Sequence, residues 1–237
     1  MSKYPKIKFK IDIQSDISNC RHFIKYDRPQ KNRSFLYQFL PKVLYYIVDQ
    51  KLSEAKKNNA IKEYVEKTYR AKMQEIKKGV AKANDDWKKI EKSYFALVDI
   101  IFKAHSWPKG KYLAYSSIFG MFPRNIRYKY FYFPSVHPIP KFSNKVVAHE
   151  MLHFIFFDYL ERHFGLKEYI SIKGKPKEYL WQVSEVFNNV IEGWPPYGKL
   201  VGDKPRPYRG TEKMFKKMSR QWREKQDIDY LLNQWLK

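Results

Sequence analysis

The segment from Val146 to Ile155 constrains this chain most, because it sets two histidines and a glutamate in an otherwise uncharged run. His149 and His153 are four residues apart, so on an α-helix both imidazoles lie on one face, one turn apart. Glu150 directly follows His149 and is rotated from it by about 100° around the helix axis. A helix that is apolar on nearly all sides is buried. The segment therefore predicts a buried helix with a single polar edge.

The expected helix has recognisable ends. Ser143 can act as its N-cap, because a serine hydroxyl accepts a hydrogen bond from a free backbone N–H of the first turn. Gly165 can adopt the left-handed conformation that ends a helix, and His163 suits the negative end of the helix dipole. The two histidines then lie near the middle of a helix of about five or six turns.

Two imidazoles on one helix face can converge on a single metal ion, and Zn²⁺ binds neutral imidazole nitrogen. Glu150 would stand beside that ion, where its carboxylate can take a proton from a bound water. The alternative is a pair of buried histidines that only form hydrogen bonds. A catalytic zinc site needs three protein ligands and an open position for water, so the hypothesis requires one more ligand.

The expected helix has no histidine at the position where one class of zinc peptidases carries its third ligand. The extended motif of one class of zinc peptidases places glycine at position 156 and histidine at position 159, where this chain has Phe156 and Tyr159. The remaining common ligand is a glutamate on a second helix.

Residues 179–192 have apolar side chains at helical spacing, and Glu185 lies off that stripe. A carboxylate among so many apolar residues is costly to bury unless it is paired or bound to metal, so we predict Glu185 as the third ligand. Glu192, about two turns further on, is the rival ligand, although its place before Gly193 favours a helix end. Either glutamate could instead belong to a solvated helix face. Asn189 is expected to accept a hydrogen bond from the free ring N–H of His149.

These residues give the chain its resemblance to a known class. His149, Glu150, His153, Glu185 and Asn189 resemble the pattern of the gluzincin-type zinc metallopeptidases, over roughly residues 110–195. Thermolysin-like members carry Asn-Glu-x-x-Ser-Asp on the second helix, and the corresponding residues 184–189 read Ser-Glu-Val-Phe-Asn-Asn. Asparagine in place of the final aspartate keeps an acceptor but loses the charge.

The resemblance implies an α+β, zincin-like fold, in which a small mixed sheet packs on an active-site helix and a glutamate helix, with additional long helices. It also implies a strand beside the active-site helix that binds substrate in extended form. We expect a single metallopeptidase-like domain over residues 1–237, with residues 34–103 as a helical N-terminal part and residues 104–195 as the zincin core.

Other segments can be assigned from their patterns. Residues 7–13 alternate and predict a half-buried strand, while residues 111–119 and 127–133 are expected to pair as a hairpin. Residues 51–92 are rich in Lys and Glu and predict a long solvated helix or helical hairpin. Residues 94–102 are expected to pack behind the motif helix. Residues 193–210 form either a lid over the metal or a connecting loop, Thr211 is expected to cap a basic helix, and Asp227 to begin the last one.

The formal net charge of +23 invites a nucleic-acid interpretation. Lysines are dispersed and outnumber arginines about threefold, whereas readers of phosphates and bases rely on arginine. We therefore expect a peptide or protein substrate and do not expect nucleic acid as the main partner. The one cysteine, Cys20, excludes an intramolecular disulfide. No signal peptide or membrane span is expected, which favours a cytoplasmic location.

The hypothesis that follows is a zinc-dependent peptidase. His149, His153 and Glu185 would hold Zn²⁺, and Glu150 would act as the general base on the water that attacks the peptide carbonyl. A donor to the developing oxyanion is also needed, and the candidates by residue type alone are His137, Tyr197, Arg206 and Tyr208. The alternatives are a protease that acts on one protein partner, a basic nucleic-acid-binding protein with a structural metal site, and an inactive relative that binds peptides. The sequence leaves the oligomeric state open.

Overall fold

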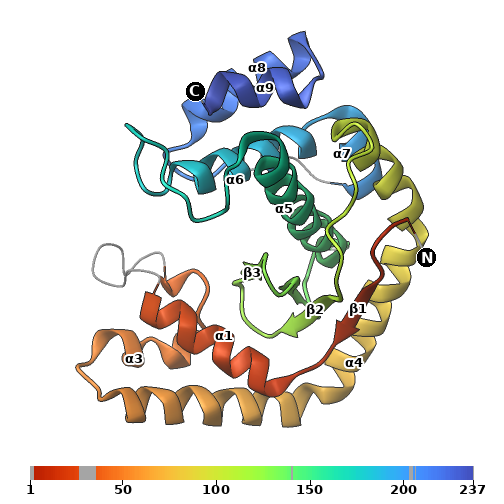
Figure 1. Ribbon diagram of the computed structural model, residues 1–237. Helices are drawn as coiled ribbons and strands as arrows, with labels where there is room; N and C mark the ends of the chain where they lie inside the picture. Colours follow the sequence, from red (N-terminus) through yellow and green to blue (C-terminus); the bar gives the residue numbers. More distant parts are fainter. Residues whose placement is uncertain (1–2, 27–35, 140, 203–204, 206, 237) are drawn as a thin grey trace. The chain divides into compact units, whose positions relative to one another are not determined.

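The computed structural model describes residues 3–26, 36–139, 141–202, 205 and 207–236. It confirms the α+β class: helices dominate and accompany one small sheet (Figure 1). In chain order the elements are β1 (Ile7–Lys10), α1 (Ile13–Tyr26), the 3-10 helix η1 (Lys42–Leu44), α3 (Tyr46–Asp49), α4 (Glu54–Ile101), β2 (Tyr112–Ser117), β3 (Arg124–Asn125), β4 (Tyr130–Pro134), α5 (Phe142–Phe164), α6 (Tyr179–Glu192), α7 (Pro195–Val201), α8 (Glu212–Glu224) and α9 (Ile228–Trp235). None of the described helices combines the length and apolar character needed to cross a membrane.

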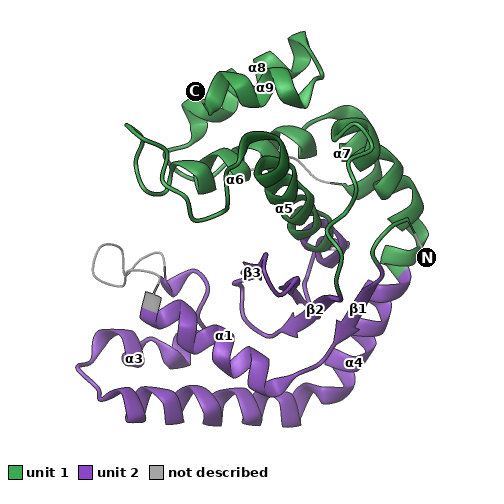
Figure 2. Cartoon of the chain, in the orientation of Figure 1, with its two compact units in different colours: residues 1–5, 86–110, 147–237 green, residues 6–85, 111–146 purple. Residues whose placement is uncertain are grey.

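The chain forms two compact units, each built from separate stretches of sequence (Figure 2). Unit 1 contains residues 1–5, 86–110 and 147–237, and unit 2 contains residues 6–85 and 111–146. The continuous helices α4 and α5 each contribute residues to both units.

Unit 2 contains the four-stranded sheet, in the order β1-β2-β4-β3. Strand β2 pairs in parallel with both β1 and β4, and only β3 runs antiparallel to its neighbour β4. The predicted hairpin between residues 111–119 and 127–133 is therefore wrong. A tight turn joins only antiparallel strands, whereas residues 118–129 form a longer connection in which β3 makes the hairpin with β4.

The first strand is shorter than predicted, because α1 begins at Ile13. The side chain of Asp12 accepts a hydrogen bond from the backbone N–H of Ser15 at 3.0 Å, which is the contact that an N-cap residue makes. The alternating pattern of residues 7–13 continued past this cap, so it predicted a strand where a helix starts.

Helix α4 is one continuous helix of 48 residues rather than a hairpin. Its unit 2 part is not solvated on all sides: a stripe at helical spacing is buried, formed by Ile61, Val65, Tyr69, Ile76 and Ala83. Gly79 allows a close approach on the same helix, because a Cβ atom there would lie 1.7 Å from the backbone oxygen of Ser135.

A buried carboxylate links three elements of unit 2. Asp16 of α1 is fully buried and accepts hydrogen bonds from the Ser117 hydroxyl at 2.6 Å, the Ile118 N–H at 3.0 Å and the Tyr69 hydroxyl at 3.0 Å. Burial raises the pKa of Asp16 to about 6, although these donors oppose the rise. The network ties α1 to α4 and to the end of β2.

In unit 1, the C-terminal end of α4 packs against α5, as predicted for residues 94–102. The hydroxyl of Tyr94 donates to the backbone oxygen of Ala148 at 2.9 Å. The ring of Phe102 contacts the rings of Tyr159 on α5 and Phe187 on α6, with centroids 5.6 and 5.7 Å apart. These contacts position the two helices that carry the predicted ligands.

Of the two predicted ends of α5, the C-terminal end is confirmed and the N-terminal cap is not. Gly165 has φ +68° and its N–H donates to the oxygen of Glu161, while the Leu166 N–H donates to the oxygen of Leu160. This is a Schellman motif, with glycine in the left-handed position. Ser143 is not the N-cap, because α5 begins at Phe142 and the Ser143 hydroxyl donates to the Pro134 oxygen at 2.6 Å.

The C-terminal helices also differ in their caps. The Asp227 side chain accepts from the Tyr230 N–H and caps α9, as predicted. Thr211 precedes α8, but its hydroxyl donates to the Tyr208 oxygen, so it forms no side-chain cap. The segment 193–210 contains the short helix α7, and so is not a plain loop.

Candidate metal centre

The predicted ligands meet between α5 and α6, entirely within unit 1. On helix α5 every residue from Val146 to Phe157 except His149 is buried, and α6 is buried from Val183 to Glu192. The Phe156 and Phe187 rings pack together across the two helices, with centroids 4.9 Å apart. The ring of Trp222 on α8 also packs against the ring of Phe187, with centroids 6.5 Å apart. These apolar contacts fix the position of α6 relative to α5, and so they hold the polar residues of the two helices opposite one another.

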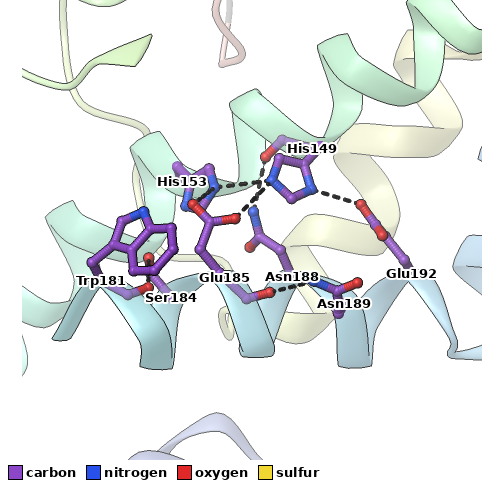
Figure 3. A network of polar contacts seen from close by, with 8 residues as sticks. All are labelled: His149, His153, Trp181, Ser184, Glu185, Asn188, Asn189 and Glu192. Carbon is purple, nitrogen blue, oxygen red and sulfur yellow. Dashed lines mark hydrogen bonds and ion pairs between the residues drawn. The ribbon is translucent and has the colours of Figure 1, made fainter. Parts of the chain in front are cut away.

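His149, His153 and Glu185 form a group whose ligand atoms, one from each residue, all lie within 4.8 Å of one another. Within the part of the chain that the structure describes, it is the only such group of three or more His, Cys, Asp or Glu residues. Figure 3 shows both imidazoles on α5 directed at the carboxylate that rises from α6. This arrangement was predicted from the sequence, and the structure shows that it could hold a metal ion.

The spacing of the ligand atoms can be compared with that of a zinc shell. The two Nε2 atoms of His149 and His153 are 3.1 Å apart. Glu185 Oε2 is 3.3 Å from Nε2 of His149, and its Oε1 is 3.4 Å from Nε2 of His153. Ligands about 2.0–2.1 Å from a tetrahedral ion are separated by about 3.3–3.4 Å. The two imidazole nitrogens are slightly closer than this, and each of them lies at about this separation from a different oxygen of Glu185.

Glu192 orients His149. Its Oε1 lies 2.7 Å from Nδ1 of the imidazole, and the carboxylate is largely buried. A neutral His149 that donates from Nδ1 carries its lone pair on Nε2, the atom that faces His153 and Glu185. Glu192 does not belong to the group of three; it is the last residue of α6, as its place before Gly193 predicted, but its carboxylate is buried rather than solvated.

Asn189 does not have the predicted role. Its Nδ2 donates to the backbone oxygen of Glu185 at 2.8 Å, one turn back along α6, instead of reaching His149. The neighbouring Asn188 was not predicted: its Nδ2 donates to the backbone oxygen of His149 at 3.0 Å and joins α6 directly to α5. Its position next to Asn189 on a buried helix was the available signal, because buried amides need partners.

Burial and the neighbouring carboxylates have opposing effects on the protonation of His149. Burial favours the neutral imidazole, but the carboxylates of Glu192 and Glu185 outweigh it and raise the pKa of His149 well above its ordinary value. Two carboxylates close to two imidazoles also form an environment that attracts a divalent cation. The negative charge of the group is concentrated on α6, opposite the histidines of α5.

Glu150 is nearly fully buried on α5, and its charge contributes to the raised pKa of His149. The side chain of His149 is 19% exposed, whereas His153 is fully buried, so solvent reaches the group on the His149 side. His163 lies in the last turn of α5, as predicted, where its Nε2 is 3.3 Å from Nδ1 of His105, and it does not belong to the ligand group.

The oxyanion candidates lie in different places. Tyr197 on α7 is buried against Tyr94, and burial raises its pKa well above the ordinary value, with smaller contributions from Tyr94 and Glu192. Tyr208 contacts the ring of Trp181 on α6. His137 belongs to unit 2, where it stacks on Phe142, and Arg206 lies outside the described residues.

Comparison with known proteins adds no family. The chain matches no protein-family model, and neither a curated protein nor a solved structure is significantly similar to it.

Proposed function

We propose that this chain is a zinc-dependent peptidase of zincin-like fold, in which His149, His153 and Glu185 hold the ion. The observation that carries the proposal is the convergence of these three side chains at separations that suit one tetrahedral ion. Two imidazoles and one carboxylate are borderline ligands that suit Zn²⁺ better than Ca²⁺ or Mg²⁺, which prefer shells of oxygen.

Bound zinc would supply a water of lowered pKa and would polarise the carbonyl of a peptide substrate. The other steps belong to the protein. Glu150, next to His149 on α5, would accept the proton of the attacking water and deliver it to the leaving amine. Glu192 would keep His149 in the tautomer that presents Nε2 to the ion.

A structural metal site is the second candidate, and the burial of the group favours it. His153 is fully buried and Glu185 is 3% exposed, and structural zinc sites are closed to solvent. Two features favour catalysis instead. Only three ligands converge among the described residues, which leaves the fourth position for water, and the charge of Glu150 acts on His149 although Glu150 does not belong to the group.

The experiment that separates the two candidates uses the zinc-loaded protein, its Glu150→Gln variant and unfolded, fluorescently labelled casein. We expect the wild type to cleave casein and lose that activity on chelation. Glu150→Gln should retain about one zinc per chain and cleave at least about 100-fold more slowly, because general acid–base catalysis contributes factors of this size. Equal cleavage by both proteins would contradict the proposed role of Glu150. Zinc bound by a wild type that cuts no peptide bond would favour the structural site.

A further inference from the structure

A second pair of histidines lies in unit 1, away from the candidate metal centre. His105 follows the C-terminal end of α4, and His163 lies in the last turn of α5. His163 comes ten residues after His153, which corresponds to about 15 Å along the helix axis. The pair is therefore separate from the three ligands predicted from the sequence.

The facing nitrogens of this pair are spaced like two ligands of one ion. Nε2 of His163 and Nδ1 of His105 are 3.3 Å apart. Two ligands of a tetrahedral zinc ion, each about 2.0–2.1 Å from it, are separated by about 3.3–3.4 Å. The alternative is a direct hydrogen bond between the two rings, and 3.3 Å is long for such a bond.

A carboxylate determines which nitrogen of His105 faces His163. Oδ2 of Asp158 lies 2.8 Å from Nε2 of His105, and the side chains of His105 and Asp158 are only 8% and 18% exposed. A neutral His105 that donates from Nε2 to this carboxylate carries its lone pair on Nδ1, the atom that faces His163. Metal-bound histidines usually have a partner of this kind, and Glu192 stands in the same relation to His149.

The backbone directly before His105 is strained. Lys103 and Ala104 have φ of +53° and +55°, although neither is glycine. Residues in this left-handed region persist only where the surrounding structure requires them, and they cluster at ligand-binding and active sites. Here they follow directly on α4 and lead to His105, whose ring packs against Tyr159 of α5 with centroids 5.1 Å apart. The ring of Tyr159 also stacks on His163 at 4.1 Å, so one side chain supports both imidazoles.

The pair is open to solvent on one side. His163 is exposed, whereas the side chain of His105 is covered. An ion held by both imidazoles would therefore keep positions for water. Nε of Arg162 lies 2.9 Å from Oδ2 of Asp158, and its positive charge opposes a cation nearby. With two protein ligands and this opposing charge, the pair should bind metal more weakly than the group of three does.

We propose that His105 and His163 form a second, exchangeable site for a divalent transition metal ion, with Asp158 as the residue that orients His105. Neutral imidazole binds Zn²⁺, Cu²⁺ or Ni²⁺ and does not suit Ca²⁺ or Mg²⁺, which prefer oxygen ligands. The bound ion joins the end of α4 to the end of α5. This site does not depend on peptidase activity, and it empties on dialysis because only two side chains hold the ion.

The test is a calorimetric titration of Zn²⁺ into the dialysed protein at about pH 7.5, because metal binding requires neutral imidazole. We expect one ion per chain to bind in addition to any ion that is retained through dialysis. His163→Ala removes a ligand at an exposed position and should abolish this additional binding. Asp158→Ala removes the orienting carboxylate and should weaken the additional binding by about 10–100-fold.

Two controls make the result specific. His137→Ala removes a histidine of unit 2 that stacks on Phe142, and it should leave the additional binding unchanged. Circular dichroism of each variant establishes that it is folded. In the wild type, NMR of the histidine rings should show zinc-dependent shifts at Nδ1 of His105 and Nε2 of His163, the two nitrogens that face each other.

Glu185→Ala separates this proposal from the proposed function. The variant should lose the ion that is retained through dialysis and keep the additional binding. Additional binding that disappears in His163→Ala supports the second site even if the wild type retains no ion through dialysis, in which case only the three-ligand proposal fails. A wild type without additional binding, or a folded His163→Ala variant that binds the additional ion equally well, overturns the second site and leaves a hydrogen-bonded pair of histidines.

Discussion

Nδ1 of His149 and Oε1 of Glu192 are 2.7 Å apart, and this contact determines which nitrogen of His149 faces the other two predicted ligands. The contact joins the middle of α5 to the last residue of α6. Because both partners are largely buried, little solvent competes with it. The geometry thus assigns to Glu192 the orienting role that was predicted for Asn189.

Removal of this carboxylate should weaken zinc binding without removing a ligand. We expect Glu192→Ala to lower the zinc affinity by about 10–100-fold, the range usual for partners of metal-bound histidines. Glu192→Gln should have a smaller effect, because an amide oxygen can still accept from Nδ1. The measurement is a competition titration against a chromophoric zinc chelator.

Asn189→Ala is the matched control for this prediction, since Asn189 lies on the same helix and its Nδ2 donates to a backbone oxygen there. It should weaken zinc binding less than Glu192→Ala does. If the order of the two effects is reversed, the assignment of Glu192 as the orienting partner is wrong.

Asp16 predicts a pH dependence of the stability of unit 2. Its pKa is about 6 in the folded protein and near the ordinary 3.8 in the unfolded chain. Because the folded value is the higher one, the contribution of Asp16 is fully present below about pH 4 and is lost as the pH rises through about 6. At about 1.4 kcal/mol per pKa unit, the full change is about 3 kcal/mol.

The Asp16→Asn variant isolates this effect from other titrating groups. Urea unfolding of both proteins between pH 4 and pH 7.5 gives the difference in their free energies of unfolding at each pH. As the pH rises, that difference should move in favour of the variant by about 3 kcal/mol. A difference that stays constant, or that moves in favour of the wild type, is incompatible with a raised pKa at Asp16.

Substitution of Gly79 by alanine should change the stability of the protein in the direction opposite to that expected from helix propensity. Alanine in place of glycine inside a helix normally stabilises by about 1 kcal/mol. Here the new Cβ would overlap the backbone oxygen of Ser135, so Gly79→Ala should instead destabilise the protein by about 1–3 kcal/mol. Ala81→Gly, at an exposed position of the same helix, is the reference and should cost about 1 kcal/mol by propensity alone. A Gly79→Ala protein more stable than the wild type would show that the loop at Ser135 moves away at little cost.

The ligand group was predictable because each of its members breaks a local pattern. His149 and His153 repeat at one helical turn in an apolar run, and Glu185 is a carboxylate among buried residues. The role of Glu192 was not predictable in the same way. It lies seven residues after Glu185, almost on the same helix face, whereas Asn189 is displaced by about 40° and has a shorter side chain. Only the distance between α5 and α6 decides which of the two reaches His149.

The fold was predictable where local patterns determine it and not where distant segments pair. Periodicity identified α4, α5 and α6, and Gly165 and Asp227 marked helix ends that the structure confirms. The aromatic strands β2 and β4 were also found, but their parallel pairing depends on the path of residues 118–129. The two interleaved units left no signal in the sequence, because α4 and α5 run through both without a break.

The central claim is that His149, His153 and Glu185 together bind one zinc ion, and the most direct test is the zinc content of the purified protein after dialysis. We predict about one zinc per chain for the wild type and far less for Glu185→Ala, which removes a ligand. His105→Ala removes a histidine that contacts His163 and Asp158 rather than the ligand group, and should retain one zinc. A wild type that binds no added zinc, or a Glu185→Ala variant that keeps the full amount, would contradict the account.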